Sequence, residues 1–334
     1  MNALTARLGG ADPKTALANF ARTWASQIGI TVALLVLWGG FIVFAPETFL
    51  AERIYLSFAQ TTPYFAITAL ALTMVIVAGD IDLSFPSIMA LGMVGFVFVW
   101  EATGSVELGV LSALLVGATA GLFNGLVVTM IGIPSLVVTI GTQFLFRGLT
   151  LVLVAGRSIP LVEARESVAY DLLVGRLFGI PMEFVWLAIG ALVTWLLLNR
   201  HRLGQNAYAI GDNAQAAALM GIPIRRTRII LFVITGLAAA FAGMMNSLRV
   251  VNFYPTMGAG YLLPTLAAVF VGGTSVFGGR GTVWGTFIGA FMIGGITAGI
   301  VAVGLTEYYT NLIYGAIILV SVSIHAILQR RISR

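Results

Sequence analysis

Long apolar stretches, separated by short polar connections, follow one another along almost the whole chain. A helix that crosses a bilayer needs about 20 mostly apolar residues. The stretches are unbroken rather than alternating, which excludes the strands of an outer-membrane barrel. We therefore predict an all-α polytopic membrane protein with ten membrane helices, at residues 27–46, 57–79, 83–101, 107–130, 134–155, 183–200, 227–251, 260–274, 281–303 and 308–328.

Three parts of this pattern need separate interpretation. The first apolar run is long for a signal peptide and ends without a small-x-small cleavage site, so we expect an uncleaved helix after a cytoplasmic segment 1–26. The eighth run is short, contains Pro264 and leads into the glycine-rich stretch GGTSVFGGRG, which favours a broken or tilted helix. The longest loop, 156–182, should carry a short surface helix near Glu163 to Leu173.

The distribution of arginine gives the chain an orientation. If the N-terminus lies inside, ten helices bring the C-terminus inside as well, and most basic residues then lie on that side. The outer side keeps only Arg53, Arg157, Arg165, Arg176 and Arg249, together with most of the acids. We therefore predict that residues 27–334 form one membrane domain with a cytoplasmic segment 201–228. The net charge of +5 is explained by topology and does not require a nucleic-acid partner.

Composition confirms the class and limits the chemistry. The chain is 59% hydrophobic and 9% charged, a balance that soluble domains do not have. It has no cysteine, and its two histidines stand far apart without metal-ligand spacing. Its one lysine, Lys14, does not belong to a phosphate-binding GxxxxGK[ST] loop. We expect no catalytic residues, no cofactor and no metal; if a nucleotide drives this protein, another chain must bind it.

Glycines recur at a spacing of four in two of the predicted helices. One row is Gly117, Gly121 and Gly125, and the other is Gly281, Gly285 and Gly289. Glycines four apart line one helix face and allow another backbone to approach closely. Two interpretations remain open: ordinary packing faces, or an inverted repeat of two halves with opposite orientations in the membrane.

Asp80 and Asp82 stand between the second and third predicted helices, in the sequence AGDIDLS. Acids buried in a membrane are costly and usually functional, so both could line a translocation path. The alternative is a cytoplasmic turn in which Asp82 caps the following helix beside Ser84.

A polar stripe lies on the fifth predicted helix, where Thr139, Gln143 and Arg147 are each four residues apart. A lipid-facing arginine would be expensive, so the stripe should face a neighbouring helix or a water-filled path. Arg147 would then pair with an acid or line the path with Gln143. Asn124, on the fourth predicted helix, is a further path candidate because an amide can bind hydroxyl groups. Hydrogen bonding between helices is the alternative role for each of these residues.

The segment 200–228 is a polar, arginine-bounded interruption of the apolar pattern. Asn213 can cap a helix, the alanines that follow favour one, and Gly221 can end it before Pro223. A short helix of small side chains can lie deep in a partner's groove. A solvated linker is the alternative, although a linker does not need this combination of caps and alanines.

Several motifs in one order carry a resemblance over nearly all of the chain, from about residue 50 to the end. They are AGDIDLSF at 78–85, PSLVVTIGTQFLFRGLT at 134–150, YAIGDNAQAAALMGIPIRRTRI, TGLAAAFAGMM and VFVGGTSVFGGRGTVWGTFIGA. In these motifs the chain resembles the permease subunit of bacterial sugar ABC importers of the ribose type. The resemblance implies a type II importer-like fold in the bacterial inner membrane, with both termini cytoplasmic.

The resemblance also implies partners and a role for the polar segment. The partners would be cytoplasmic ABC ATPase subunits, a periplasmic sugar-binding protein, a second permease subunit in a homodimer or heterodimer, and the lipid bilayer. Residues 206–224 correspond to the coupling helix that docks on the ATPase, which by motif match gives Gly211, Asn213, Ala216, Ala217, Gly221 and Ile222. Asp212 departs from the pattern, since the family often has glycine there.

The expected cargo is a monosaccharide, either a pentose, a hexose or a related polyol. Nucleosides or branched-chain amino acids are alternative cargo for the same machinery. A proton-coupled secondary transporter that uses Asp80 or Asp82 as its relay is an alternative of another class. A membrane scaffold is a third possibility, against which the polar stripe argues.

Overall fold

The computed structural model describes residues 25–302, 304 and 308–332, so the predicted cytoplasmic segment 1–26 lies almost entirely outside the described residues. All ten predicted helices are present, with bounds within a few residues of those expected. They are α2 (Ala25–Phe44), α4 (Glu52–Val77), α5 (Phe85–Thr103), α6 (Val106–Leu126), α7 (Ser135–Leu153), α9 (Met182–Asn199), α12 (Ile224–Val250), α13 (Leu262–Val271), α14 (Val283–Ala302) and α15 (Tyr308–Ile332).

Among the described residues, eight helices are long and apolar enough to cross a membrane. The other two apolar helices are shorter: Ala259–Val271, which includes α13, and Tyr308–Ser323 within α15. The fold is therefore the all-α polytopic architecture that the sequence predicts, with short helices α3 (Pro46–Phe49) and η2 (Val127–Ile131) at two of its connections.

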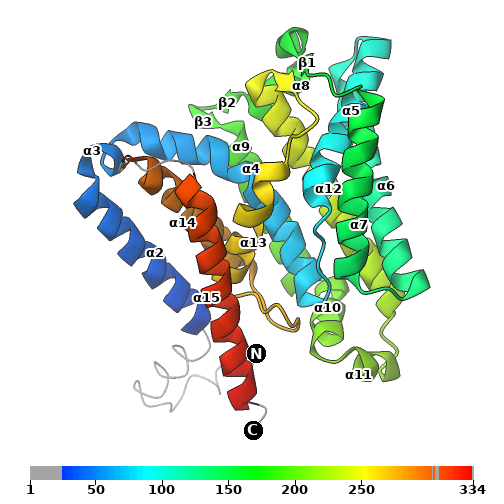
Figure 1. Cartoon of the computed structure of the whole chain (residues 1–334), viewed down its shortest axis with the longest axis vertical. Coiled ribbons are helices and arrows are strands. Elements are labelled where there is room, and N and C mark those ends of the chain that lie inside the picture. The colour runs from blue at the N-terminus through cyan, green and yellow to red at the C-terminus, as the bar shows by residue number, and fades with distance from the viewer. Residues whose placement is uncertain (1–24, 303, 305–307, 333–334) are drawn as a thin grey trace, which may run out of the picture.

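Helix α4 lies at the centre of the core. Every residue from Thr62 to Val77 is buried, and the helix packs against α9, α12, α13 and α14. A helix that is apolar all round is stable only inside a bundle. The first part of α4 runs across the molecule before the helix turns toward α10 (Figure 1). Pro63 lies inside α4. Proline removes one backbone hydrogen bond and crowds the preceding turn, which accounts for a bend.

Both glycine rows are close-packing faces, as one of the two interpretations requires. A Cβ atom on Gly121 of α6 would lie 2.3 Å from the carbonyl oxygen of Phe232 in α12. In α14, a Cβ atom on Gly289 would lie 2.2 Å from the carbonyl oxygen of Ala268 in α13. Gly281 precedes α14 rather than belonging to it, because the helix begins at Val283. The inverted repeat stays a prediction.

The eighth apolar run forms a short helix, as its proline and glycines indicate. Helix α13 has 10 residues and follows the single turn η4 (Ala259–Tyr261). The glycine-rich loop 272–282 that follows has positive φ at Gly273, Gly278 and Gly279, a backbone conformation that glycine adopts without strain. This loop extends toward α10 (Figure 1).

The two ends of the bundle carry different small elements (Figure 1). At one end lie η3 (Val162–Glu166) and α8 (Val168–Val174), which confirm the predicted surface helix, with the strand pairs β1 (Ile159–Pro160) with β4 (Asn252–Phe253), and β2 (Arg176–Leu177) with β3 (Ile180–Pro181). At the other end lie α10 (Arg202–Asp212) and α11 (Ala214–Leu219). The start of α2 and the end of α15 are also at this second end.

Candidate functional site

The polar segment 201–228 folds as two short helices that project from the bundle (Figure 1). Asn213 caps α11 as predicted, because its side-chain oxygen accepts a hydrogen bond from the backbone N–H of Ala216 at 2.9 Å. Gly221 has a φ of +77° just after α11, and the N–H of Ile222 donates to the carbonyl of Ala217 at 3.1 Å. These bonds define a capped helical turn rather than a linker.

The face that α11 presents to solvent does not include every predicted coupling residue. Ala217 is 0% exposed, so its side chain packs against the rest of the chain. Although α11 has fewer than two turns, one of its faces packs against α10 and α12. The exposed apolar side chains are instead Leu219, at 91%, and Met220, at 69%.

Gly211 also lies against the chain itself rather than on an open surface. A Cβ atom there would lie 1.8 Å from the carbonyl oxygen of Val77 and 2.5 Å from the nitrogen of Gly279. The N–H of Gly279 donates to that same carbonyl at 2.9 Å. The hydroxyl of Tyr208 donates to the carbonyl of Gly281 at 2.7 Å, and burial raises the pKa of this phenol. The end of α10 is thereby joined to α4 and to the loop 272–282.

Asp80 lies in the connecting segment 78–84, which joins α4 to α5. Its carboxylate pairs with the Nε atom of Arg228, near the start of α12, at 2.9 Å. The next residue is held by α7: the N–H of Ile81 donates to Ser135 at 3.0 Å, and its carbonyl accepts from Thr139 at 3.2 Å. The polar groups on this segment are therefore bound by two different helices.

Asp82 is completely buried, which does not fit a solvated turn. Its Oδ1 atom accepts hydrogen bonds from the N–H of Ser84 at 2.8 Å and from the hydroxyl of Ser84 at 2.6 Å. Ser84, rather than Asp82, occupies the N-cap position of α5. Asn124 donates to the Ser84 hydroxyl at 2.7 Å. Ser84 therefore links Asp82 with Asn124, two of the residues predicted to line the path. One oxygen of Asp82 and the amide oxygen of Asn124 have no hydrogen-bond partner among the described residues.

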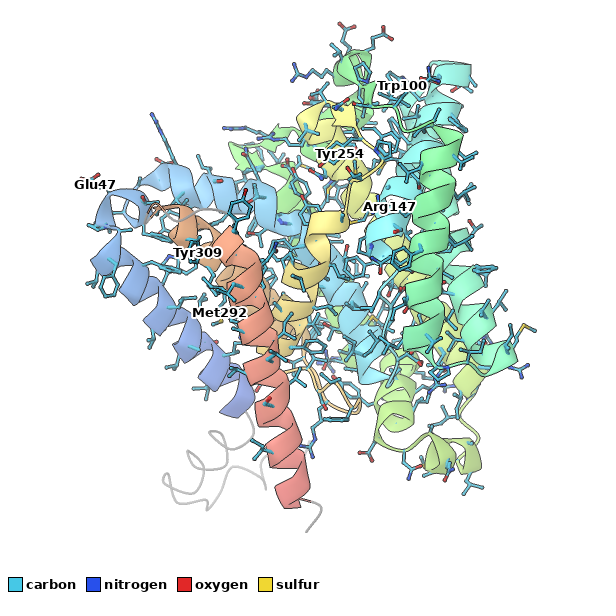
Figure 2. The ribbon with its side chains drawn as sticks, in the orientation of Figure 1. Glu47, Trp100, Arg147, Tyr254, Met292 and Tyr309 are labelled. Atoms are coloured by element: carbon cyan, nitrogen blue, oxygen red, sulfur yellow. The ribbon has the colours of Figure 1, made fainter. Side chains whose placement is uncertain are left out.

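The polar stripe on α7 faces α5 and the loop that follows α12. Arg147 lies inside the bundle (Figure 2) and donates to the carbonyls of Pro86 at 2.9 Å, Met257 at 2.8 Å, and Pro255. Of the two alternatives predicted for Arg147, pairing with an acid is not observed among the described residues, where backbone carbonyls bind its guanidinium. A place beside the path with Gln143 stays a prediction. Gln143 is half-buried, and its backbone carbonyl accepts from Ser87 at 2.7 Å.

Sequence reasoning missed one further buried carboxylate, that of Glu183. Glu183, in the first turn of α9, is 0% exposed and accepts from the hydroxyl of Tyr64 at 3.3 Å. Its other neighbour is the Nε atom of Arg249, at 3.7 Å. The sequence signals only an acid at the start of an apolar run. Its partners stand on α4 and α12, which no local pattern identifies.

The end of the bundle that carries α8 also opens into a cavity of about 850 Å³. Four exposed carboxylates line it, from Glu101, Glu107, Glu163 and Glu166. Within the described part of the chain, no group of three or more histidine or acidic residues could hold a metal ion.

Comparisons with known proteins agree in matching the chain to permease components of transport systems. A model of the family described as "Branched-chain amino acid transport system / permease component" matches residues 54–322. The chain is 32% identical to the ribose import permease protein RbsC of Escherichia coli K12, over 91% of this chain and 94% of that protein. It is 31% identical to the D-allose transport system permease protein AlsC of the same strain, over 93% and 95%.

A third relative has a different cargo in its name. The autoinducer 2 import system permease protein LsrD of Yersinia enterocolitica is 30% identical, over 92% of this chain and 95% of that protein. No solved structure matches the chain.

Proposed function

Because the chain belongs to the family of permease components of branched-chain amino acid transport systems, we propose that it is the membrane subunit of an ATP-driven importer for a monosaccharide or related polyol. The chain is a transport subunit and not an enzyme. Support for the cargo comes from the relatives named for ribose and D-allose, a pentose and a hexose, which match nearly the whole chain.

The α10–α11 segment is the proposed docking site for a separate ATPase chain. The observation that carries this proposal is the pair of large apolar side chains, Leu219 and Met220, exposed at the tip of a polar, arginine-bounded segment. Exposed apolar side chains that project in this way mark interaction sites. Asn213, Gly221 and Ile222 fix the turn that presents them, and Ala216 lies exposed beside them.

The same proposal gives the molecule its orientation in a bacterial inner membrane. The end with α10 and α11 faces the cytoplasm together with both termini, and the acidic cavity at the other end faces a periplasmic sugar-binding protein. A second copy of this chain, or a similar chain, completes the transport unit. We place the translocation path beside the polar residues gathered near the start of α5, which are Asp80, Asp82, Asn124, Thr139, Gln143 and Arg147.

The docking proposal is tested by removing the exposed apolar pair. A chain with both Leu219→Ser and Met220→Ser should insert normally, lose co-purification of the ATPase by about 30-fold, and lose uptake, since apolar anchors of an interface contribute about 2 kcal/mol or more. The matched control is Phe178→Ser, because Phe178 is 97% exposed at the opposite end of the bundle. The control should keep the ATPase. Retention of the ATPase by the double variant would show that α11 is not the docking site.

The cargo is tested separately, with purified components in vesicles. Uptake of labelled ribose and allose should require the binding protein and ATP, and should continue when the proton gradient is collapsed. Uptake that needs the gradient and not ATP would instead support a secondary transporter.

A further inference from the structure

Three chain segments that are distant in sequence meet backbone to backbone at the C-terminal end of α4. They are the end of α10 at Gly211, the start of the connecting segment 78–84, and the loop 272–282. A Cβ atom on Gly278 would lie 2.9 Å from the carbonyl oxygen of Gly211 and 3.0 Å from the Cα atom of Gly79. Only glycine leaves room for this approach, so a displacement of α10 cannot be absorbed by side chains at this point.

A second contact joins the same connecting segment to the chain that follows α11. Arg228 lies in the second turn of α12, just after the α11 turn, and holds Asp80 at 2.9 Å. The exposed helix α11 therefore lies between two attachments in the sequence, Gly211 before it and Arg228 after it. Both attachments are made to residues within or next to the segment 78–84.

The segment reached by these contacts leads into the polar interior. Its first three residues donate backbone hydrogen bonds to the last turn of α4, and residues 81–84 have no regular secondary structure. Such irregular segments absorb the φ and ψ changes of a conformational step. Two residues beyond Asp80 it carries the buried carboxylate of Asp82, and it ends at the N-cap of α5. The loop 272–282, the other segment at the junction, connects α13 with α14.

We propose that the glycine junction at Gly211 and the Asp80–Arg228 ion pair form a two-point attachment that transmits movement of α10–α11 to the segment 78–84 and the loop 272–282. This inference rests on the proposed function, because it needs an ATPase that moves α11. Asp80 and Arg228 are positioning residues in this scheme, because they act on coupling through the segment that they hold.

The test measures ATP hydrolysis and solute uptake in the same vesicles, with the complete importer reconstituted from permease, ATPase and binding protein. Arg228→Gln should keep the ATPase bound and raise the ratio of ATP hydrolysed to solute transported by about tenfold, because a coupling free energy is lost. Arg228→Lys keeps the charge and should stay within about twofold of the original ratio. A purely structural role would lower the yield of folded complex without changing this ratio.

The backbone half of the attachment has its own matched pair of variants. Gly211→Ala would place a Cβ atom 1.8 Å from the carbonyl oxygen of Val77, whereas Gly141→Ala meets nothing within 4 Å. We expect the first variant to uncouple hydrolysis from uptake and the second to behave as the original. If Gly211→Ala does not fold, the ratio of ATP hydrolysed to solute transported in Arg228→Gln is the test of the attachment, since that variant leaves the glycine contacts intact.

The outcomes separate this inference from the proposed function. If the original chain transports without an ATPase, the proposed function fails and the attachment fails with it. If the original chain couples hydrolysis to uptake and Arg228→Gln couples equally well, only the attachment is wrong.

Discussion

The two ends of α12 use the same chemistry for different purposes. Near its start Arg228 binds Asp80 at 2.9 Å, and in its last turn Arg249 lies 3.7 Å from Glu183. The first carboxylate stands on the segment that connects α4 with α5, whereas the second stands on α9 and also accepts from Tyr64 of α4. The Arg249–Glu183 pair therefore holds three helices together, while the Arg228–Asp80 pair holds a connecting segment whose residues 81–84 have no regular secondary structure.

This difference teaches that the structural context of an ion pair decides its role. An ion pair between helices that already pack against each other can contribute to stability, because the packing fixes the positions of both charged groups. An ion pair on an irregular segment can also transmit a displacement, because that segment can change conformation. The following predictions test the distinction, from the largest expected effect to the smallest.

Arg147 provides the extreme case, an arginine held by backbone carbonyls alone. Arg147→Leu leaves three buried acceptors without this donor, and each unsatisfied group costs about 1–3 kcal/mol, so we expect a loss of about 4 kcal/mol in the free energy of unfolding. The measurement is thermal unfolding of the purified protein. Arg147→Lys should lose less, because an ammonium group can still reach some of the carbonyls. An unchanged unfolding midpoint in Arg147→Leu would show that the three bonds are dispensable.

In the last turn of α12, Arg249→Met leaves the carboxylate of Glu183 buried without its cation. Breaking such a pair costs about 3–5 kcal/mol, and we expect about 3 because Arg249 is partly exposed. Its thermal unfolding midpoint should fall, while the protein that remains folded keeps the original ratio of ATP hydrolysed to solute transported. A changed ratio would contradict the division of roles between the two ends.

The middle of α12 is tested at its contact with α6. Gly121→Ala forces a methyl group toward the Phe232 carbonyl and should cost about 2 kcal/mol, in the range of overpacked cores. Gly141→Ala is the control on an open helix face and should be neutral or slightly stabilising. Equal stabilities of the two variants would show that α12 shifts on α6 without penalty, and α12 would then not be a rigid connection between its ends.

The smallest effect is expected from cysteine labelling, which identifies the cytoplasmic end. Thr103, Thr256 and Asp212 are all exposed, so single cysteines there should leave stability unchanged. An impermeant reagent added to intact cells should label positions 103 and 256 and leave position 212 unlabelled. Labelling of 212 would invert the orientation and exchange the roles proposed for the two ends.

Much of the fold could be predicted because apolar length and helix caps are local signals. Ten helices, the short α13 and the surface helix α8 all follow from runs of apolar residues, prolines and glycines, and the Asn213 cap follows from its neighbours. The candidate site could be predicted only in part. Sequence reasoning found Asp80 and Arg147, but it did not find Arg228 or the three carbonyls as their partners.

What the sequence by itself determined is the class of protein, its helices and its family motifs, because hydrophobic length and residue order act within a single segment. Only the tertiary structure decided that Ala217 faces inward, that Gly211 joins three segments, and that Glu183 is buried against Tyr64 and Arg249. The physical reason is that a helical sequence specifies which residues share a face, whereas the packing of other helices decides which face is covered.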